Sequence, residues 1–536
     1  MGWIDDTADW TMRKWYRLLR KEMPAVVAAY ESLPGLTTRG FVAPGGGAHL
    51  HVDAPIQFQG MSTQVAGLWP FSNGTSSPLI GAPLGRDQTT GQPLLGDPLS
   101  LFLYGIMSAP SAFILALNGR GKSSLVVRIC LGIMDLGFIP LFLGDLKPDY
   151  VGLVKAVGGQ HIRLGLGGVG CVNALDAGPI AKWLHRLSPQ TRTEVEGQIH
   201  GRRVNTVAGL IEMMLRRRLS EEQSEHMVLS TAIRVAAEEA AQEGRQPELA
   251  DVRRVIVARH PRIREAILDM SEDEYDAEVK SLVKGITALG PEGVFGGMFW
   301  GQTTVEMDMH APVVFDVSSI DEGEADLRAA AQLVIWSYGQ AGALAAQTLA
   351  NEPDMEDPEP DAAKKRRLGP EVHHLMVMDE LWQILQAWEG SVYRINTITK
   401  VNRQKGLGQI MITHSMKDLE LSTSERTKMA FGFVERSSMV FLGGLAENEQ
   451  EDLRRIRRFS DREIAQLVEW SAEGTVNPAT GEMNPPPGRG RFLLKTSDAP
   501  GIPFRIELTS QEKEIHDTNA AWANAIAAAR GEGAAA

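Results

Sequence analysis

Seven residues between an apolar segment and a helix-like segment most constrain how this chain can fold. They are Asn118, Gly119, Arg120, Gly121, Lys122, Ser123 and Ser124. Residues 113–117 before them are apolar, as in a buried strand, and residues 125–134 after them have a helical pattern. The two glycines let the backbone curl so that its N–H groups point at phosphate oxygens, assisted by the positive end of the following helix. The stretch is therefore a phosphate-binding loop, or P-loop, in the setting that such a loop requires.

The chemistry of this loop assigns roles to two of its side chains. Lys122 is expected to reach the β- and γ-phosphates of a nucleoside triphosphate, and Ser123 is expected to hold Mg²⁺. The full loop pattern begins with a glycine, and Ala116 stands at that position. Because the flanking segments agree with the motif, we expect nucleotide binding in spite of this departure.

Composition sets wider bounds on the chain. Its 536 residues, 43% hydrophobic and 23% charged, have an ordinary soluble-globular balance and are enough for several domains. The net charge of -13 argues against a body that coats nucleic acid, although a local basic channel would not change that sum. The two cysteines form neither a disulfide framework nor a metal set, and we recognise no secretory signal or membrane span. A cytoplasmic location is expected.

The order of patterns along the chain predicts an α/β fold with a mostly parallel central sheet. Strand and helix patterns alternate, with strands expected at 112–117, 139–144 and 312–317 and a helix at 123–136. Six regions are expected: an amphipathic helix at 1–33, a Gly/Pro-rich wrapping region at 34–98, the P-loop half of a motor domain at 99–180, a helical insertion at 181–300, the second half of the motor at 301–515 and a flexible tail at 516–536. The first helix could dock on a membrane or a partner, or pack on its own domain.

Two later segments complete the expected site. An apolar run from Leu375 ends in Asp379 and Glu380, where Asp379 would hold Mg²⁺ and Glu380 would orient and deprotonate the attacking water. A further strand at 409–412 precedes His414, which is placed to sense the γ-phosphate. Upstream lies Arg403, which could reach the ATP of a neighbouring subunit or simply face solvent; the residues alone leave both open.

In this order the motifs resemble the FtsK/HerA superfamily of ring ATPases, and most of all the TraC-type ATPases of type IV secretion and conjugation. Other stretches that carry the resemblance are Leu68–Phe71, Gly81–Gly85, Gly91–Asp97, Gly144–Tyr150, Gly158–Gly159, Asn173–Asp176, Asp379–Trp382, Arg403–Gly406 and Thr413–Leu419. The resemblance covers residues 65–515 and implies a RecA-like P-loop ATPase core that uses ATP and Mg²⁺. It also implies that Arg403 acts in trans, as an arginine finger, in a homohexamer.

Three positions depart from the family pattern. His414 replaces a glutamine, Ala116 replaces the first P-loop glycine, and Arg120 replaces a residue that is usually small. Histidine can still hydrogen-bond water or phosphate, but it titrates near neutrality. We therefore expect turnover that is more pH-sensitive between about 6 and 8 than in a His414→Gln variant.

The leading hypothesis is a hexameric ATPase motor that energises a type IV secretion or conjugation system from the cytoplasmic face of the membrane. Its expected partners are membrane-embedded channel subunits and a DNA or protein substrate. A first alternative is a DNA translocase or helicase, with Arg202, Arg203 and Arg216–Arg218 either lining a pore or forming the polar face of the insertion. A second is a nucleotide-switched scaffold without turnover. His373 and His374 are expected to be structural, since no spaced ligand set accompanies them.

Overall fold

A computed structural model describes residues 78–167, 169–219, 224–267, 271–352, 373–475, 484–496 and 500–515, and two short strands near the N-terminus. Those strands are β1 (Leu36–Thr37) and β2 (Gly40–Phe41), which pair antiparallel. The chain divides into two compact units, Met1–Asn73 and Gly74–Ala536. The helix expected at 1–33, the motif at 68–71 and the tail at 516–536 lie outside the described residues.

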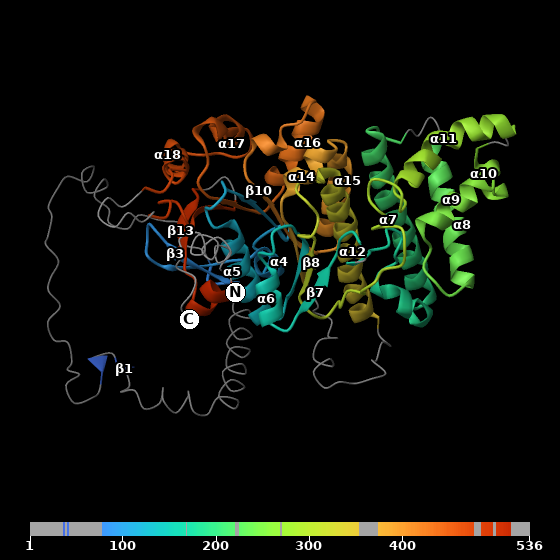
Figure 1. Cartoon of the computed structure of the whole chain (residues 1–536). Coiled ribbons are helices and arrows are strands. Elements are labelled where there is room, and N and C mark those ends of the chain that lie inside the picture. The colour runs from blue at the N-terminus through green and yellow to red at the C-terminus, as the bar shows by residue number, and fades with distance from the viewer. Residues whose placement is uncertain are drawn as a thin grey trace, which may run out of the picture. The chain divides into compact units, whose positions relative to one another are not determined.

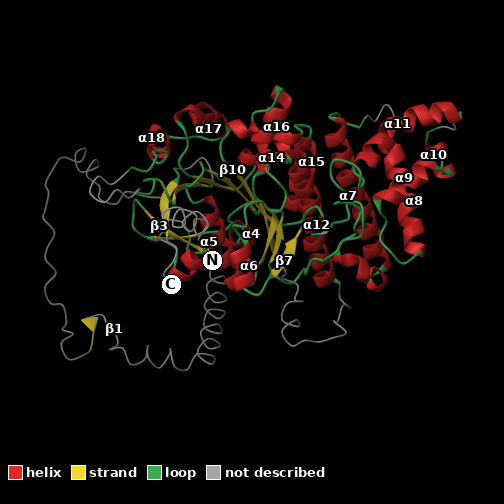
Figure 2. Ribbon diagram, in the orientation of Figure 1, coloured by secondary structure: helices red, strands yellow, loops and turns green. Residues whose placement is uncertain are grey.

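One sheet organises the second unit (Figure 2). Its strands are β3 (Pro83–Asp87), β4 (Pro93–Leu95), β5 (Ser111–Leu115), β6 (Ile139–Asp145), β7 (Gln160–Arg163), β8 (Val313–Asp316), β9 (His374–Met378), β10 (Gly408–Thr413), β11 (Met439–Leu442), β12 (Arg491–Lys495) and β13 (Ile502–Ile506). Their order is β4-β3-β13-β12-β11-β5-β10-β9-β6-β8-β7. The strands from β11 to β7 run parallel, and the other four extend one edge antiparallel.

The central strands are apolar throughout because helices cover both faces of the sheet. In β5, Phe113 and Leu115 join the hydrophobic cluster on one face, while Ala112 and Ile114 join the cluster on the other. The second face is covered by α4 (Pro98–Leu103), α5 (Lys122–Asp135), α6 (Val151–Ala156) and α19 (Ser510–Ile515). The first face carries α12 (Ala325–Asn351), α14 (Leu381–Ala387), α15 (Ser391–Gln404), α16 (Ser424–Glu435), α17 (Gln450–Ile456) and α18 (Asp461–Glu469).

A helical layer is inserted between β7 and β8 and lies beyond α12 (Figure 1). It comprises the 3₁₀ helix η1 (Pro179–Arg186) and the helices α7 (Pro189–Leu215), α8 (Glu225–Gln242), α9 (Leu249–Val257), α10 (Pro261–Ala266) and α11 (Glu272–Ala288). Gly209 of α7 lets the two long helices approach closely, because a Cβ there would lie 2.8 Å from Cδ2 of Leu333 on α12. The layer therefore packs directly on the core.

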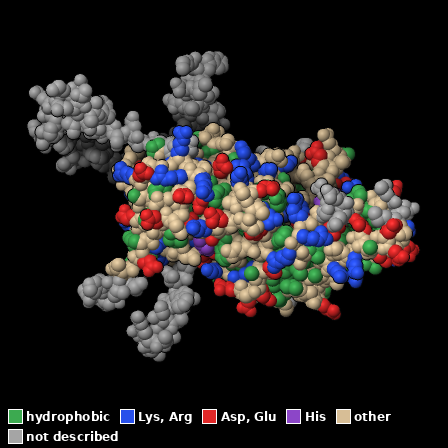
Figure 3. All heavy atoms as spheres, turned by 90° about the horizontal axis from the view of Figure 1, so that it is seen from above, with side chains coloured by type: hydrophobic (Ala, Val, Ile, Leu, Met, Phe, Trp, Pro, Cys, Tyr) green, Lys and Arg blue, Asp and Glu red, His purple; other side chains and the backbone are tan. Residues whose placement is uncertain are grey.

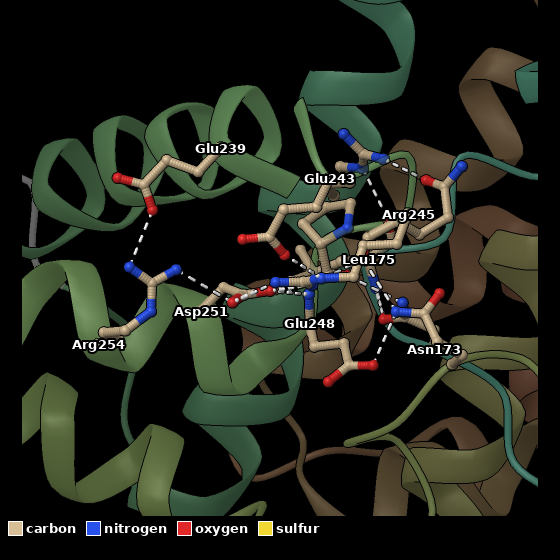
Figure 4. A network of polar contacts seen from close by, with 12 residues as sticks. Asn173, Leu175, Glu239, Glu243, Arg245, Glu248, Asp251 and Arg254 are labelled. Atoms are coloured by element: carbon tan, nitrogen blue, oxygen red, sulfur yellow. Dashed lines mark hydrogen bonds and ion pairs between the residues drawn. The ribbon is translucent and has the colours of Figure 1, made fainter. Parts of the chain in front are cut away.

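Ion pairs around the buried Asp251 connect helices of this layer (Figure 4). Arg245 donates two hydrogen bonds to Asp251, at 2.6 and 2.9 Å, and Arg254 links Asp251 to Glu239. Burial would raise the pKa of Asp251, but these arginines and the backbone N–H of Glu248 outweigh it and lower that pKa to about 2. Asp251 is thus held as a carboxylate by partners within the layer.

The expected strands and helix at the P-loop agree with the structure within one or two residues. Residues 112–117, 123–136, 139–144 and 312–317 correspond to β5, α5, β6 and β8. Residues 83–95, expected to wrap the motor, form β3 and β4 and extend the sheet itself. Among the described residues, no helix is both long enough and apolar enough to cross a bilayer.

Candidate functional site

The P-loop connects β5 to α5 at the carboxyl edge of the parallel strands. Gly119 and Gly121 have φ of 74° and 96°, in the left-handed region that favours glycine, and α5 begins at the next residue, Lys122. A Cβ at Gly119 would meet nothing within 4 Å, so the loop has open space above it. The local structure is the strand, loop and helix that the motif predicts.

Lys122 is folded back over its own loop. Its Nζ donates to the carbonyl of Ala116 at 2.8 Å and lies 3.3 Å from Oδ1 of Asn118 and 2.7 Å from Nδ1 of His414. Burial lowers the pKa of this ammonium, and the negative charges of Asp379 and Glu380 oppose that effect. The lysine and the histidine after β10 are thus brought together.

Glu380 approaches the same place from the end of β9. Its backbone is left-handed, with φ 53° and ψ 43°, a conformation that costs roughly 1–2 kcal/mol for a residue with a Cβ. Its Oε2 lies 2.8 Å from Nε2 of His414 and also accepts the indole N–H of Trp382. Burial raises the pKa of Glu380, but the hydrogen bonds from His414 and Trp382 bring it below its usual value.

His414 therefore bridges the P-loop lysine and the candidate catalytic carboxylate. The contacts fit an imidazole whose Nε2–H donates to Glu380 while Nδ1 accepts from Lys122. The turn that presents His414 is fixed by Asp418, whose Oδ2 accepts from Oγ1 of Thr413 and from the backbone N–H groups of His414 and Ser415. This arrangement places one ring nitrogen on each of the two groups.

Asp379 is held beside this bridge by a tyrosine. Its Oδ2 accepts the hydroxyl of Tyr150 at 2.7 Å, and its Oδ1 accepts the N–H of Glu380 at 2.8 Å. Burial and the neighbouring Glu380 charge raise the pKa of Asp379, against the opposing effect of the tyrosine hydrogen bond. The carboxylate is oriented, but its negative charge is poorly compensated.

More carboxylates gather around Ser123. Its Oγ donates to Oδ2 of Asp149 at 2.7 Å, and Asp145 accepts the backbone N–H groups of Asp149 and Tyr150. Burial raises the pKa of Asp145 well above its usual value, and the charges of Asp149 and Asp379 add to the rise. A divalent cation would relieve this crowding of negative charge.

The residues present fit Mg²⁺ and a nucleotide. A serine hydroxyl and carboxylates are oxygen donors of the kind that Mg²⁺ prefers, usually completed by waters and substrate phosphates. Within the described ranges no group of three His, Cys, Asp or Glu residues is arranged to hold a metal alone. A cation at this place would be held by Ser123 and Asp379 together with phosphate oxygens.

Arg120 takes a structural position within the loop. Its guanidinium is buried and donates to the carbonyls of Ser471 and Ala472, while its own carbonyl accepts the N–H of Gly490. Burial lowers the pKa of this side chain. Only the backbone of Arg120 is left to face phosphate, because its side chain ties the P-loop to the segment after α18. Ser124 follows in the first turn of α5.

Ala116, the other departure in the loop, is compensated across the sheet. Its side chain is fully buried, and residue 443 at the end of β11 is a glycine. A Cβ at Gly443 would lie 2.5 Å from the Cβ of Ala116, closer than two carbons can approach. The methyl group of Ala116 therefore occupies space that Gly443 leaves open.

Arg403 is not brought to the P-loop of its own chain. It is exposed, near the end of α15 and before β10 begins, so it lies at the amino edge of the sheet. The P-loop and His414 lie at the opposite edge. Its role in trans stays a prediction.

Several residues that contact the candidate site were given no role by the sequence, although most of them lie in stretches that carry the resemblance. Asp149 and Tyr150 follow β6, and because carboxyl ends of parallel strands meet at one edge, that position could have indicated them. Trp382 belongs to the stretch Asp379–Trp382 that carries the resemblance, but the resemblance did not indicate its hydrogen bond to Glu380. Gln332 on α12, which donates to the carbonyl of Asp379 at 3.1 Å, comes from a helix with no motif.

The arginines suggested for a nucleic-acid pore have partners within the chain. Arg202 and Arg203 donate to the carbonyls of Asp176 and Leu175, and Arg203 is buried. The remaining contacts are Arg216 with Asp326, Arg217 with Glu225 and Arg218 over the ring of Tyr393. On the face shown in Figure 3, basic and acidic side chains are interspersed.

His374 is structural in form, as expected. It is fully buried, and its Nε2 lies 2.9 Å from the carbonyl of Met309. Burial lowers its pKa to about 4. His373 packs edge-on against Phe138.

Comparison with known proteins identifies the fold. No family model and no curated protein matches the sequence. The structure of VirB4 from Thermoanaerobacter pseudethanolicus matches with a TM-score of 0.54 and 19% identity, over 82% of this chain and 100% of that one. Two structures of the bacterial conjugative coupling protein TrwB also match. The form in complex with sulphate gives a TM-score of 0.47 and 10% identity over 82% of this chain and 96% of that one, and the complex with ADP and Mg²⁺ gives 0.45 and 11% over 75% and 86%.

The argument on the fold rests on the VirB4 structure, whose TM-score exceeds one half. At 19% identity this likeness shows the fold alone. The predicted fold class, a RecA-like α/β P-loop core with a mostly parallel central sheet and a helical insertion, is confirmed. The likeness also agrees with the resemblance that the motifs carried in the sequence.

Proposed function

We propose that this chain is an ATPase motor that energises a type IV secretion or conjugation-type transfer system. One observation carries the proposal: Lys122, His414 and Glu380 form a continuous bridge beside Ser123 and Asp379 at the open edge of the sheet. The fold shared with VirB4 supports the kind of machine. The binding of ADP and Mg²⁺ reported for TrwB supports the choice of ligand.

The side chains divide the work of hydrolysis. Lys122 leaves the carbonyl of Ala116 and Nδ1 of His414 to contact the β- and γ-phosphates, while Ser123 and Asp379 hold the cation. Bound Mg²⁺ would neutralise charge on the phosphates. Glu380 accepts a proton from the attacking water, and His414 keeps that carboxylate oriented through its Nε2–H.

In the proposed assembly, six copies form a ring and each ATP lies at a subunit interface. Arg403, which lies at the edge of the sheet opposite its own P-loop, serves the ATP of a neighbouring copy. The ring would act at the inner face of the cell membrane with channel subunits as partners, moving DNA or protein. Hydrolysis at an interface converts directly into motion between subunits.

The alternatives have less support. A DNA translocase would use basic side chains, yet the arginines considered for a pore are engaged within the chain. A scaffold without turnover would not require an oriented carboxylate with a lowered pKa beside the P-loop lysine. The motor therefore remains the conclusion.

Phosphate release in the presence of ATP and Mg²⁺ tests the proposal. We expect turnover in the unmodified protein, none in Lys122→Ala, and normal turnover in Lys155→Ala, an exposed lysine on α6 that serves as the matched control. Mass measurement with and without ATP is expected to show a hexamer. Phosphate release that persists in Lys122→Ala would refute the assigned site, and hydrolysis that requires DNA in a salt-dependent way would favour the translocase.

A further inference from the structure

A second pocket lies at the amino edge of the sheet, at the far ends of the strands that carry the site. Its volume is about 130 Å³. Its lining includes Ser111, the first residue of β5, and Gln409, the second residue of β10. Its walls include Lys400, Arg403 and Arg436, from α15 and the end of α16. Three cations therefore line one compact cavity.

The described residues that line this pocket include no carboxylate, and the negative charge of Glu435 acts on Arg436 from outside the lining. The side chains of Lys400 and Arg403 form no hydrogen bond or ion pair with any part of the chain that the structure describes. Arg436 donates to Oδ1 of Asn396 at 3.1 Å and lies over the ring of Phe433, and neither partner carries a negative charge. Burial lowers the pKa of Arg436; the Glu435 charge opposes this, and the Arg403 charge adds to it.

A phosphate group is the anion that this geometry suits. Guanidinium groups present parallel N–H donors that match phosphate oxygens, and an ammonium adds a point charge. A nucleic-acid backbone is instead tracked by an extended basic groove with stacking platforms, and this cavity is compact. The pocket fits a single phosphate-bearing end of a ligand.

The phosphate cannot come from ATP on the P-loop of the same chain. β5 separates the pocket from that loop by five residues, or roughly 16 Å at the rise of a parallel strand. A nucleotide bound to Lys122 therefore lies at the opposite edge of the sheet. The occupant has to be carried by another molecule, and a second copy of this chain in a ring would supply one.

We propose that Lys400 and Arg436 join Arg403 in a receiving pocket for the γ-phosphate of ATP bound to a neighbouring subunit. This inference rests on the proposed ring ATPase and adds two residues to the single arginine that the resemblance implied. Arg403 and Arg436 neutralise the charge that develops on the phosphoryl oxygens, and Lys400 strengthens the local positive potential. Each catalytic centre is then complete only when two copies meet.

Mixing experiments test the inference. Arg436→Gln and Lys400→Gln are each expected to lower phosphate release, by about 10²-fold for Arg436→Gln, the size seen when one charge-stabilising donor is removed. Mixed with Lys122→Ala subunits, which lack their own site but keep the pocket, each variant is expected to regain activity. Arg192→Gln, an exposed arginine paired within α7, is the matched control and should leave the rate unchanged.

Several results would overturn the inference. Turnover at the wild-type rate in Arg436→Gln would contradict it. A second contradicting result is that Arg436→Gln stays inactive when mixed with Lys122→Ala subunits while Arg403→Gln recovers activity in the same mixture. The proposed ring ATPase would still be consistent with that second result. Arg436→Lys, which keeps the charge, is expected to recover part of the rate, and identical melting curves for all variants exclude misfolding. A variant that loses DNA binding but hydrolyses normally would assign the pocket to nucleic acid, and one in which only inhibition by free phosphate changes would assign it to inorganic phosphate.

Discussion

Gly443→Ala tests the physical reason why this P-loop tolerates an alanine at its first position. The new methyl carbon would lie 2.5 Å from the Cβ of Ala116 and 3.2 Å from Cε1 of Phe492. Overpacking of a buried site costs about 1–3 kcal/mol, and two contacts at once place this change near 2 kcal/mol. The start of the P-loop would shift, and with it the carbonyl of Ala116 that Lys122 contacts.

Urea unfolding and the Kd of a non-hydrolysable ATP analogue measure this effect. We expect the free energy of unfolding to fall by about 2 kcal/mol. We also expect the Kd to rise about tenfold, because a shift of the loop that weakens binding by about 1.4 kcal/mol changes the Kd by a factor of about ten. Gly201→Ala is the matched control: it lies inside α7, a Cβ there meets nothing within 4 Å, and it should be neutral or slightly stabilising.

The double variant Ala116→Gly/Gly443→Ala decides whether the two positions compensate each other. Ala116→Gly alone removes one buried methyl group and should cost about 1 kcal/mol. In the double variant the 2.5 Å contact is gone. The stability that the double variant loses should therefore be about 1 kcal/mol smaller than the sum of the losses in the two single variants. Strictly additive losses would refute the reasoning.

Three further predictions concern buried polar groups. Arg120→Met removes two hydrogen bonds from a buried, charged guanidinium and should cost about 2–4 kcal/mol in urea unfolding. We also expect faster release of a fluorescent ADP analogue, and unchanged release would show that this anchor does not hold the loop. Burial lowers the pKa of His374 to about 4, so as pH falls below 6.5 the unfolded chain takes up a proton that the folded chain does not, and the free energy of unfolding drops by about 3 kcal/mol by pH 4. His374→Leu should lack this contribution to the loss of stability in acid. An unaltered dependence of stability on pH in that variant would contradict the prediction. The pKa of Asp379 is raised, so Mg²⁺-dependent nucleotide binding should weaken as the pH falls through that pKa. Tyr150→Phe removes a hydrogen bond to the carboxylate and should therefore move the midpoint of this pH dependence to higher pH in a binding titration. A midpoint that stays or falls would refute the role of Tyr150.

Much of the site was predictable because its pieces follow buried strands. The apolar runs of β5, β9 and β10 are each followed directly by chemistry: Lys122, the Asp379–Glu380 pair and His414. Parallel strands bring their carboxyl ends to one edge, so convergence of these groups follows from the βα pattern. The observed contacts of Lys122 and Glu380 with His414 are what that rule predicts.

The remaining features depend on contacts between distant parts of the chain. The pairing of β13 with β3 joins segments about four hundred residues apart, and neither strand has a local pattern that names its partner. The buried guanidinium of Arg120 donates to carbonyls some three hundred and fifty residues away. The position of Gln332 on a nearly all-buried helix likewise becomes visible only once α12 is packed on the sheet.

The central claim is that Lys122 and Glu380 act on one triphosphate, and the nucleotide retained by Glu380→Gln tests it most directly. The variant is incubated with ATP and Mg²⁺, separated from free nucleotide, denatured, and its bound nucleotide identified by chromatography. The account predicts intact ATP, because the binding residues are untouched while the base that deprotonates water is gone. Recovery of ADP, with phosphate released at the unmodified rate, would contradict it.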